Sequence, residues 1–255
     1  MRNLKRDLFS LEGKVAIVTG GAQGLGEAMA IGLAKYGAKI IVADISYEKA
    51  QEMTKRNREF NIEIYKLDVT QKKQIYKMVN KIIGRFKKID ILVNSAGTII
   101  RKPVVDLTEK DWDTVLTINL KGTFLCCQAV GKFMIKQRRG KIINIASVSS
   151  KLGHMERAAY AASKGGVVQL TKVMAHEWAK YGINVNAISP AICETPLTIG
   201  LRDSKEKINK ITNKIPIGRL GKPEDLIGSV IYLSSKASDF VTGHNLFVDG
   251  GRTID

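Results

Sequence analysis

Short apolar runs alternate with longer amphipathic stretches along almost the whole chain, and this alternation restricts the possible folds more than any other feature of the sequence. The apolar runs are rich in Val and Ile, and runs such as KIIVA (39–43) and IDILV (89–93) lack strict polar alternation. Such runs are typical of strands that are covered on both faces. Repeated strand and helix units of this kind predict a parallel sheet with right-handed crossovers.

We therefore predict one α/β domain of the Rossmann type over residues 1–255, with a doubly wound parallel β-sheet of about seven strands and helices on both faces. A chain of 255 residues that is 44% hydrophobic can bury one large core, and no internal repeat or linker divides it. The predicted strands are residues 14–19, 39–43, 62–67, 89–93, 141–146, 183–188 and 246–248, and the predicted helices are roughly 24–36, 47–58, 72–86, 109–137, 158–181 and 223–233.

One connection in this pattern is unusually long. Residues 190–214 are polar and lysine-rich, and they separate the predicted strand at 183–188 from the predicted helix at 223–233. They follow the carboxyl end of a strand, which is where open α/β sheets bind ligands. We interpret this segment as a lid over the substrate, in preference to a disordered insertion.

Charge and composition exclude several classes of partner. The formal net charge of +17 attracts anions in general, but the basic residues are dispersed and aromatic residues make up only 6% of the chain. Because no basic stripe alternates with stacking side chains, we expect no nucleic acid partner. No apolar run has the length of a membrane span and no signal-peptide core precedes Val15, so we expect no membrane partner and a soluble, cytoplasmic protein. Cys126, Cys127 and Cys193 lack metal-ligand spacing, so no metal is expected.

A glycine-rich turn follows the first predicted strand and opens the first predicted helix. It reads T-G-x-x-x-G-x-G from Thr19 to Gly26. Glycines at such a turn let the backbone approach a pyrophosphate, whose charge is received by free N–H groups at the helix N-terminus. We therefore predict a dinucleotide site here, with contacts from Gly20, Gln23, Gly24, Leu25 and Gly26.

Asp44 closes the second predicted strand, twenty residues after Gly24. An acidic side chain at this place can bind the hydroxyls of the adenosine ribose and repel a 2′-phosphate. No arginine stands at Gln23 or Ile45 to receive such a phosphate, so the sequence favours NAD as the cofactor over NADP. Asp44 could also be an ordinary helix cap, and Asp68 could either meet the adenine or cap the next helix.

Tyr160 and Lys164 are four residues apart, so they share one face of the predicted helix at 158–181. A tyrosine titrates near pH 10, and proton transfer at neutral pH needs a pKa lower by roughly three units, or about 4 kcal/mol. A neighbouring cation can supply this by stabilising the phenolate. Ser147 follows the strand at 141–146, at the same end of the sheet. The Tyr–Lys spacing alone is also common in ordinary amphipathic helices.

Together with Asn94-Ser95-Ala96-Gly97 and Asn119, these motifs occur in an order that resembles the short-chain dehydrogenase/reductase family over about residues 11–251. The resemblance implies that Tyr160 is the general acid/base and that Lys164 lowers its pKa and binds the nicotinamide ribose. It also implies that Ser147 hydrogen-bonds the reacting oxygen and that Asn119 holds a water molecule that connects Lys164 to solvent. The alternatives are a loop or cap serine at Ser147 and a locally bonded amide at Asn119.

Two positions depart from the family pattern. Ser95 replaces a second asparagine, and Ala191 follows Pro190 where the family has glycine. If that glycine has a positive φ, Ala191 is strained. The further cofactor contacts that the resemblance implies are Ile45, Asp68, Val69, Asn94, Ala96, Gly97, Tyr160, Lys164, Pro190, Cys193 and Thr195.

Within the family, several segments are similar to dehydrogenases of sugar acids such as gluconate and keto-deoxygluconate. Arg101, His154 and Arg157 lie near the predicted site and could hold a substrate carboxylate beside Ser147 and Tyr160, or could be solvated loop residues. We expect an NAD(H)-dependent oxidoreductase that acts on an anionic alcohol or ketone. The alternatives are a steroid, polyol or 3-oxoacyl-carrier substrate, or a dinucleotide-binding regulatory protein. The resemblance also implies a homotetramer, with the helices at 109–137 and 158–181 in one interface.

Overall fold

A single seven-stranded parallel sheet forms the centre of the molecule in the computed structural model, which describes residues 8–201 and 204–254. The strand order is β3-β2-β1-β4-β5-β6-β7, and every neighbouring pair is parallel. This confirms the predicted fold class. The strands are β1 (Val15–Thr19), β2 (Lys39–Asp44), β3 (Ile62–Lys66), β4 (Ile91–Asn94), β5 (Gly140–Ile145), β6 (Ile183–Pro190) and β7 (Asn245–Val248).

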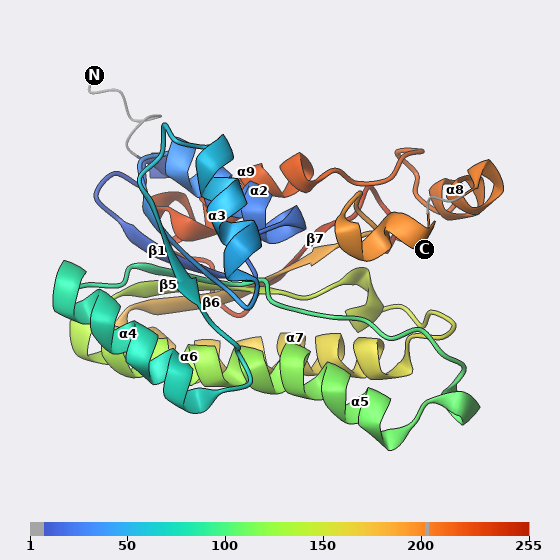
Figure 1. The fold of residues 1–255 in the computed structure, drawn as a ribbon, viewed down its shortest axis with the longest axis horizontal. Coiled ribbons are helices and arrows are strands. Elements are labelled where there is room, and N and C mark those ends of the chain that lie inside the picture. Colours follow the sequence, from blue (N-terminus) through green and yellow to red (C-terminus); the bar gives the residue numbers. More distant parts are fainter. Residues whose placement is uncertain (1–7, 202–203, 255) are drawn as a thin grey trace.

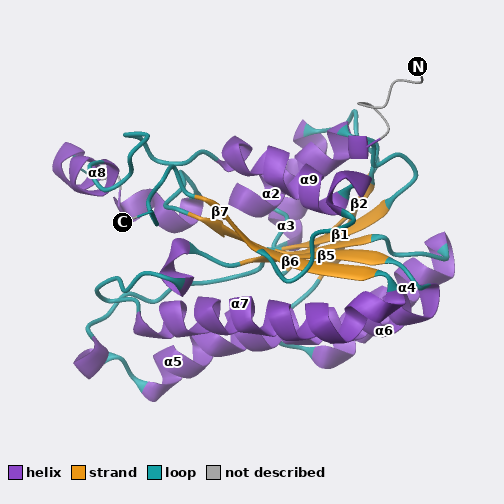
Figure 2. Cartoon of the chain, turned by 180° about the vertical axis from the view of Figure 1, so that it is seen from behind, coloured by secondary structure: helices purple, strands orange, loops and turns teal. Residues whose placement is uncertain are grey.

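Helices cover the sheet on both faces, and Figures 1 and 2 show the two layers. One layer contains α2, α3 and α9, and the other contains α4, α5, α6 and α7, while α8 lies at the side of the molecule. The helices are α2 (Gly24–Lys35), α3 (Tyr47–Arg56), α4 (Lys72–Phe86), α5 (Glu109–Leu116), α6 (Gly122–Gln137), α7 (Ala158–Trp178), α8 (Lys205–Thr212) and α9 (Ile227–Ser234).

The central strand β1 shows why its sequence is apolar without alternation. Val15 and Ile17 pack into the core cluster that includes residues of α4, α6 and α7. Ala16 and Val18 pack into the opposite cluster, which includes residues of α2 and α9. Successive side chains of a strand point to opposite faces, so a strand between two helix layers must be apolar at every position.

The helix predicted at 109–137 is wound differently in its middle. A π-helical turn at Thr117–Lys121 separates α5 from α6, and it contains Asn119. Such turns occur often at functional sites, and the apolar pattern of the sequence did not predict it. The helix predicted at 223–233 likewise begins as a 3₁₀ turn, Pro223–Leu226, before α9.

The predicted lid contains helices that its polar composition did not reveal. A 3₁₀ helix spans Pro196–Leu201 and α8 follows, while residues 202–203 of this segment lie outside the described residues. The side chain of Ser204 caps α8 by accepting a hydrogen bond from the backbone N–H of Lys207 at 3.2 Å. An N-cap of this kind stabilises a short helix that has no buried residue of its own.

The order of the strands reverses between β1 and β4, and this reversal positions the site. Crossovers leave β1 toward one face and β4 toward the other, so a crevice opens at the carboxyl ends of these two strands. Within residues 8–201 and 204–254, no helix is both long and apolar enough to cross a membrane. Residues 1–7, on which much of the signal-peptide prediction rests, lie outside the described residues.

Candidate active site

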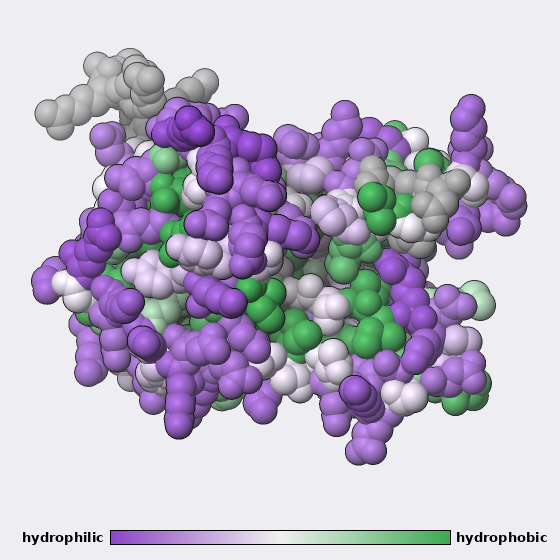
Figure 3. All heavy atoms as spheres, viewed as in Figure 1, coloured by the Kyte–Doolittle hydropathy of each residue, from purple (hydrophilic) through white to green (hydrophobic). Residues whose placement is uncertain are grey.

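A cavity of about 600 Å³ opens at the carboxyl ends of the strands, within the usual size range of small-molecule sites. Figure 3 shows apolar side chains gathered near the middle of this face, with hydrophilic side chains around them. Nearly all the predicted cofactor and substrate residues line the cavity. They are Gly20, Gln23, Gly24, Leu25, Gly26, Asp44, Ile45, Asp68, Val69, Ala96, Gly97, Arg101, Ser147, Arg157, Tyr160, Lys164, Pro190, Cys193 and Thr195.

The glycine-rich turn forms one end of the cavity. Gly20 and Gly24 have φ values of +64° and +60°, a conformation that favours glycine. A Cβ atom at Gly26 would collide with the carbonyl group of Gly20, so only glycine lets the turn close this tightly. The Gln23 side chain does not cap α2 in the described structure but accepts a hydrogen bond from Lys49 Nζ. The first N–H groups of α2 are therefore available to an anion such as a pyrophosphate.

Asp44 is held rigidly at the edge of the cavity. Its two carboxylate oxygens accept hydrogen bonds from the backbone N–H groups of Ala22, at 3.0 Å, and Ser46, at 2.9 Å. Each oxygen retains a lone pair for a ribose hydroxyl. Lys49 lies beside this end of the cavity, where its Nζ is 2.9 Å from Gln23 Oε1, and the sequence analysis did not consider it.

Asp68 does not cap α4, whose N-cap residue is Gln71. It lines the cavity, and its Oδ1 atom accepts hydrogen bonds from the backbone N–H and the hydroxyl of Thr70. These bonds fix the turn that leads into α4. Asn94, by contrast, is not brought to the cavity: its side-chain amide donates to Asn144 Oδ1 at 2.9 Å within the core.

Asn119 lies behind the cavity wall, where it holds two segments together. Its Oδ1 accepts a hydrogen bond from the backbone N–H of Thr98, and its Nδ2 donates to the Thr98 carbonyl and to Ser163 Oγ. A Cβ atom at Gly97 would lie 3.3 Å from Asn119 Oδ1 and 3.7 Å from Lys164 Nζ. Gly97 thus separates the Asn119 amide from the Lys164 ammonium. Thr98 and Ser163 were missed by the sequence analysis because only the fold brings them to Asn119.

Tyr160 and Lys164 lie on the first two turns of α7, and Ser147 lies beyond the end of β5. Lys164 is 5% exposed, and its Nζ donates to the Ile145 carbonyl at 2.7 Å and lies 5.7 Å from the centroid of the Tyr160 ring. Burial lowers the pKa of Lys164 to about 8. The ammonium therefore loses its proton more readily than an ordinary lysine does.

The pKa of Tyr160 differs from the sequence expectation. Burial raises it above its ordinary value, while a hydrogen bond from Ser147 and the charges of Arg157 and Arg101 lower it in part. The Nζ of Lys164 donates a hydrogen bond to the Ile145 carbonyl. The charges that lower the pKa of Tyr160 are those of two arginines, Arg157 and Arg101, which the sequence analysis had assigned only to the substrate.

These two arginines come from distant segments that a backbone hydrogen bond joins. The N–H of Lys102 donates to the carbonyl of Glu156 at 3.2 Å. Arg101 precedes Lys102 and Arg157 follows Glu156, so this bond brings the two arginines together at one side of the cavity. Glu156 has a φ of +61°, a strained conformation for a residue other than glycine. Arg101 Nε is buried and has no hydrogen-bond partner among the described residues. The pair forms a concentrated positive charge in the wall of the cavity.

His154 is placed differently from the other predicted substrate residues. It does not line the cavity as described, and its Nδ1 is 3.0 Å from Ser149 Oγ. Burial and the charges of Arg157, Arg252 and Lys214 lower the pKa of His154. The imidazole is therefore neutral at physiological pH.

The segment after β6 closes the nicotinamide end predicted for the cavity. Ala191 is not among the described residues with a positive φ, so replacement of the family glycine causes no strain of that kind. The hydroxyl of Thr198 donates to the Cys193 carbonyl at 2.6 Å and fixes the turn that carries Cys193 and Thr195. Burial raises the pKa of the Cys193 thiol to about 12, so this cysteine is not a thiolate nucleophile.

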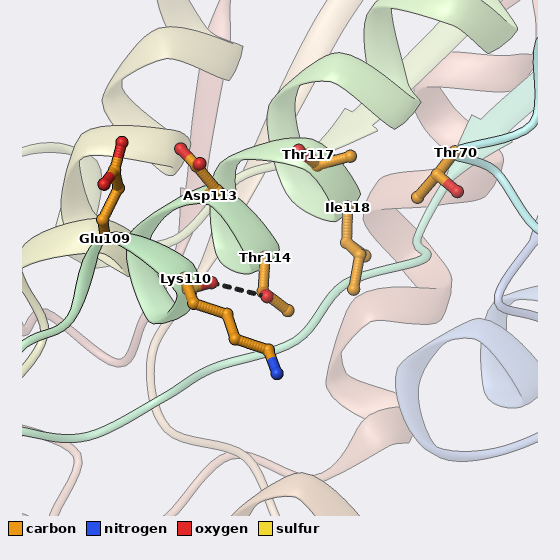
Figure 4. A pocket seen from close by; sticks show the side chains of 7 residues that line it. All are labelled: Thr70, Glu109, Lys110, Asp113, Thr114, Thr117 and Ile118. Atoms are coloured by element: carbon orange, nitrogen blue, oxygen red, sulfur yellow. Dashed lines mark hydrogen bonds between the residues drawn. The ribbon is translucent and has the colours of Figure 1, made fainter.

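A second hollow of about 580 Å³ lies over the start of α5, beside the first through the shared residues Thr70 and Ile118. Figure 4 shows Thr114 of this hollow bonded to the Lys110 carbonyl of its own helix. Its carboxylates are two residues of one helix, Glu109 and Asp113. No group of three or more metal-ligating side chains occurs in the described part of the chain.

The site combines two functions in one cavity at the switch point of a parallel sheet. The glycine turn can bind a pyrophosphate, and the tyrosine beside a serine and a lysine can transfer a proton. This combination is that of a dinucleotide-dependent oxidoreductase. The comparison with known proteins agrees. A family model described as enoyl-(acyl carrier protein) reductase matches residues 20–253. The chain belongs to the short-chain dehydrogenase/reductase family, as its motifs predicted, and is a dehydrogenase or reductase acting on CH–OH groups.

The similar proteins include enzymes of sugar acids. A 2-dehydro-3-deoxy-D-gluconate 5-dehydrogenase of Escherichia coli K12 is 44% identical over 249 residues, covering 95% of this chain and 96% of that protein. A 5-keto-D-gluconate 5-reductase of the same organism is 42% identical, covering 97% and 98%. The structure of a gluconate 5-dehydrogenase from Burkholderia cenocepacia J2315, in complex with NADP and tartrate, matches with a TM-score of 0.95 and 41% identity, covering 98% and 99%. That relative holds the dinucleotide that the sequence argument disfavoured.

Proposed function

We propose that this protein is an NAD(H)-dependent dehydrogenase of a sugar acid, such as gluconate or a keto-deoxygluconate. The observation that carries the proposal is the meeting of Arg101 and Arg157 in the same cavity wall as Tyr160 and Ser147. Two guanidinium groups beside a proton-transfer residue suit a substrate that has both a carboxylate and a secondary alcohol or ketone. The similarity to sugar-acid enzymes supports the same substrate class.

The residues divide the chemistry between them. In alcohol oxidation, Tyr160 accepts the hydroxyl proton, and in ketone reduction it returns that proton to the oxygen. The Ser147 hydroxyl hydrogen-bonds the same oxygen and holds it in place. When bound, the nicotinamide accepts or supplies the hydride. Arg101 and Arg157 hold the carboxylate and also favour the phenolate form of Tyr160.

Replacement of Tyr160 by phenylalanine tests the central assignment. We expect Tyr160→Phe to lower kcat by about 100-fold to 10,000-fold, the usual contribution of a positioned acid/base, while dinucleotide binding is unchanged. Tyr36→Phe is the matched control, because Tyr36 is an exposed tyrosine at the end of α2. Near wild-type turnover of Tyr160→Phe would show that the proton is transferred by another group.

The substrate class is tested by a panel of hexonates, ketodeoxyhexonates, polyols, steroids and 3-oxoacyl thioesters, followed by nicotinamide absorbance. Activity should be highest with the sugar acids. Arg101→Ala should raise KM for these substrates by roughly 10-fold to 100-fold, since it removes a charge-assisted hydrogen bond, and should leave KM for an uncharged polyol unchanged. Activity confined to steroids would contradict the proposal.

The assignment of NAD rests on Asp44, whose carboxylate is fixed at the ribose end of the cavity. Lys49 opposes this preference, because its ammonium lies beside Gln23 and could pair with a 2′-phosphate. We expect kcat/KM to be higher with NAD, Asp44→Ala to reduce the difference and Lys49→Ala to increase it. A strong preference of the wild-type enzyme for NADP would overturn the role given to Asp44.

We also propose that the enzyme is a cytoplasmic homotetramer in which α5, α6 and α7 form one interface. Trp112, Phe124 and Val173 are exposed on these three helices, and Figure 2 shows the helices together as an outer layer. Apolar side chains exposed on adjacent helices suit a subunit contact. Light scattering should give a tetramer for the wild type and smaller species for Phe124→Arg, whereas a monomeric wild type would reject the proposal.

A further inference from the structure

Ser147 belongs to a chain of hydrogen bonds that continues away from the cavity. It caps the 3₁₀ turn Val148–Ser150, and the backbone N–H of Ser149 donates to Ser147 Oγ at 3.1 Å. The Ser150 hydroxyl donates to the Ser147 carbonyl at 2.7 Å. Both bonds fix Ser147 within this turn.

The direction of these bonds decides what the Ser147 hydroxyl can do. A hydroxyl that accepts a hydrogen bond from an N–H group on one side has its own proton free to donate on the other. Ser147 also lines the cavity together with Tyr160, and its hydroxyl lowers the pKa of the Tyr160 phenol. Ser147 is therefore set to donate to the phenolate or to the reacting oxygen, where negative charge develops.

The next residue in the chain of bonds is Ser149, which is 4% exposed. Its hydroxyl lies 3.0 Å from His154 Nδ1, across the loop that connects β5 to α7. The charged groups that face His154 are Arg157 on its own loop, Lys214 after α8 and Arg252 near the C-terminus. All three are cations, so the imidazole is neutral. In the tautomer that carries its proton on Nε2, Nδ1 accepts the proton of the Ser149 hydroxyl.

We propose that His154 is a positioning residue, which acts through Ser149 to orient the Ser147 hydroxyl and does not bind the substrate carboxylate. This proposal rests on the proposed function only in one respect, that Ser147 and Tyr160 bind the substrate oxygen that reacts. His154 fixes the hydroxyl of Ser149, so the Ser149 backbone keeps its N–H directed at Ser147 Oγ. The assignment replaces the substrate contact that the sequence suggested for His154.

Single variants of the 255-residue chain, and one double variant, test this assignment. His154→Phe and Ser149→Ala each remove the bond between the two side chains, and His154→Asn retains an acceptor, since an asparagine Oδ1 can take the place of the imidazole Nδ1. Met155→Ala is the control, because Met155 is on the same loop and is 90% exposed. Kinetics are measured with whichever alcohol or ketone of the panel the wild type converts fastest.

We expect His154→Phe and Ser149→Ala to lower kcat by roughly 10-fold to 100-fold and to change KM by less than about threefold. His154→Asn should recover most of kcat. The double variant His154→Phe/Ser149→Ala should be no slower than either single variant, because the two residues act as one unit. A rise in KM at constant kcat would show that His154 contacts the substrate, and unchanged kinetics would show that it has no function in the reaction; either overturns the proposal.

A second readout does not depend on turnover. The hydrogen bond from Ser147 lowers the pKa of Tyr160, so a less ordered Ser147 should raise that pKa. Tyrosine ionisation is followed by ultraviolet absorbance, with each variant compared with the same variant carrying Tyr160→Phe. His154→Phe should raise the Tyr160 pKa by roughly 0.5 to 1 unit and His154→Asn should not. An equal Tyr160 pKa in all variants would overturn the proposal even if the protein had no dehydrogenase activity, whereas an active Tyr160→Phe enzyme would contradict the proposed function alone.

Discussion

The two ends of the cavity are built in different ways. The part of the dinucleotide end that faces the pyrophosphate and the adenosine ribose comes from one continuous segment, β1, the glycine turn, α2 and β2, whose bounds the sequence predicts to within a residue or two. The substrate end combines three distant segments, near Arg101, near Arg157 and after β6, and these meet through bonds such as that between Lys102 and Glu156. Local geometry forms the first end, whereas tertiary contacts form the second. Substitutions at the two ends should therefore affect different properties of the enzyme.

The largest effect should follow a change at the dinucleotide end. We expect Gly26→Ala to weaken dinucleotide binding by at least about 100-fold, because the new Cβ would collide with the Gly20 carbonyl, which is backbone and cannot move aside. Titration of NADH fluorescence measures this. Gly228→Ala in α9 is the control, since a Cβ there meets open space in the described structure and an exposed helix gains about 1 kcal/mol from alanine. Normal binding by Gly26→Ala would contradict the tight turn.

Lys164 connects the two ends, and its burial should cost stability. Its folded pKa of about 8 lies below the unfolded value of 10.5, so the folded state holds fewer protons between these two pH values. The free energy of unfolding should therefore rise as pH increases from about 8 to 10.5, and the penalty is fully present below pH 8. We expect Lys164→Met to be more stable than the wild type at pH 7 by up to about 3 kcal/mol and nearly inactive.

Urea unfolding of the wild type and Lys164→Met at pH 7 and at pH 10 checks this prediction. The difference in stability should become smaller at the higher pH, because the lysine of the folded wild type is then neutral and most of the cost of burying its charge is gone. A difference that does not change with pH would mean that the charge of Lys164 is not the cause.

At the substrate end, loss of one arginine should shift a pH profile. Arg157 lowers the pKa of Tyr160, so Arg157→Gln should raise that pKa. Alcohol oxidation needs the phenolate, and the rising limb of kcat against pH should therefore move to higher pH by roughly 0.5 to 1 unit. Lys172→Gln makes the same change in net charge on an exposed position of α7, about 18 Å along the helix from Tyr160, and should not shift the limb. An equal shift in both variants would attribute the effect to net charge.

The smallest effect should occur at Glu156, the strained residue that precedes Arg157. Its φ of +61° costs a residue with a Cβ roughly 1 to 2 kcal/mol, while glycine adds freedom to the unfolded chain. We expect Glu156→Gly to increase stability by up to about 1 kcal/mol, measured by urea unfolding, and Glu156→Ala to give no such gain. Equal stability of the two variants would show that the backbone is not strained there.

The sequence predicted the parts of the site that depend on neighbouring residues, and it missed those that depend on tertiary contacts. The strands, the glycine turn, Asp44 and the pairing of Tyr160 with Lys164 were predictable, because each depends on residues that are close together in the chain. The function of Ser149 was not, since it depends on a backbone N–H and a histidine that the fold brings together. Burial likewise raised the pKa of Tyr160, although the neighbouring lysine had suggested the opposite. α8 was missed because it is short and mostly polar, and its two large apolar residues, Ile208 and Ile211, are not buried.

The π-helical turn at Thr117–Lys121 is equivalent to one residue inserted into an otherwise regular helix. Each residue rotates an α-helix by about 100°, so α6 faces a direction that an uninterrupted continuation of α5 would not give it. In this orientation Cys126 and Cys127 lie in the core. Deletion of one residue from this turn would therefore turn the whole inner surface of α6 away from the sheet, a far greater change than any single side chain in the helix could cause.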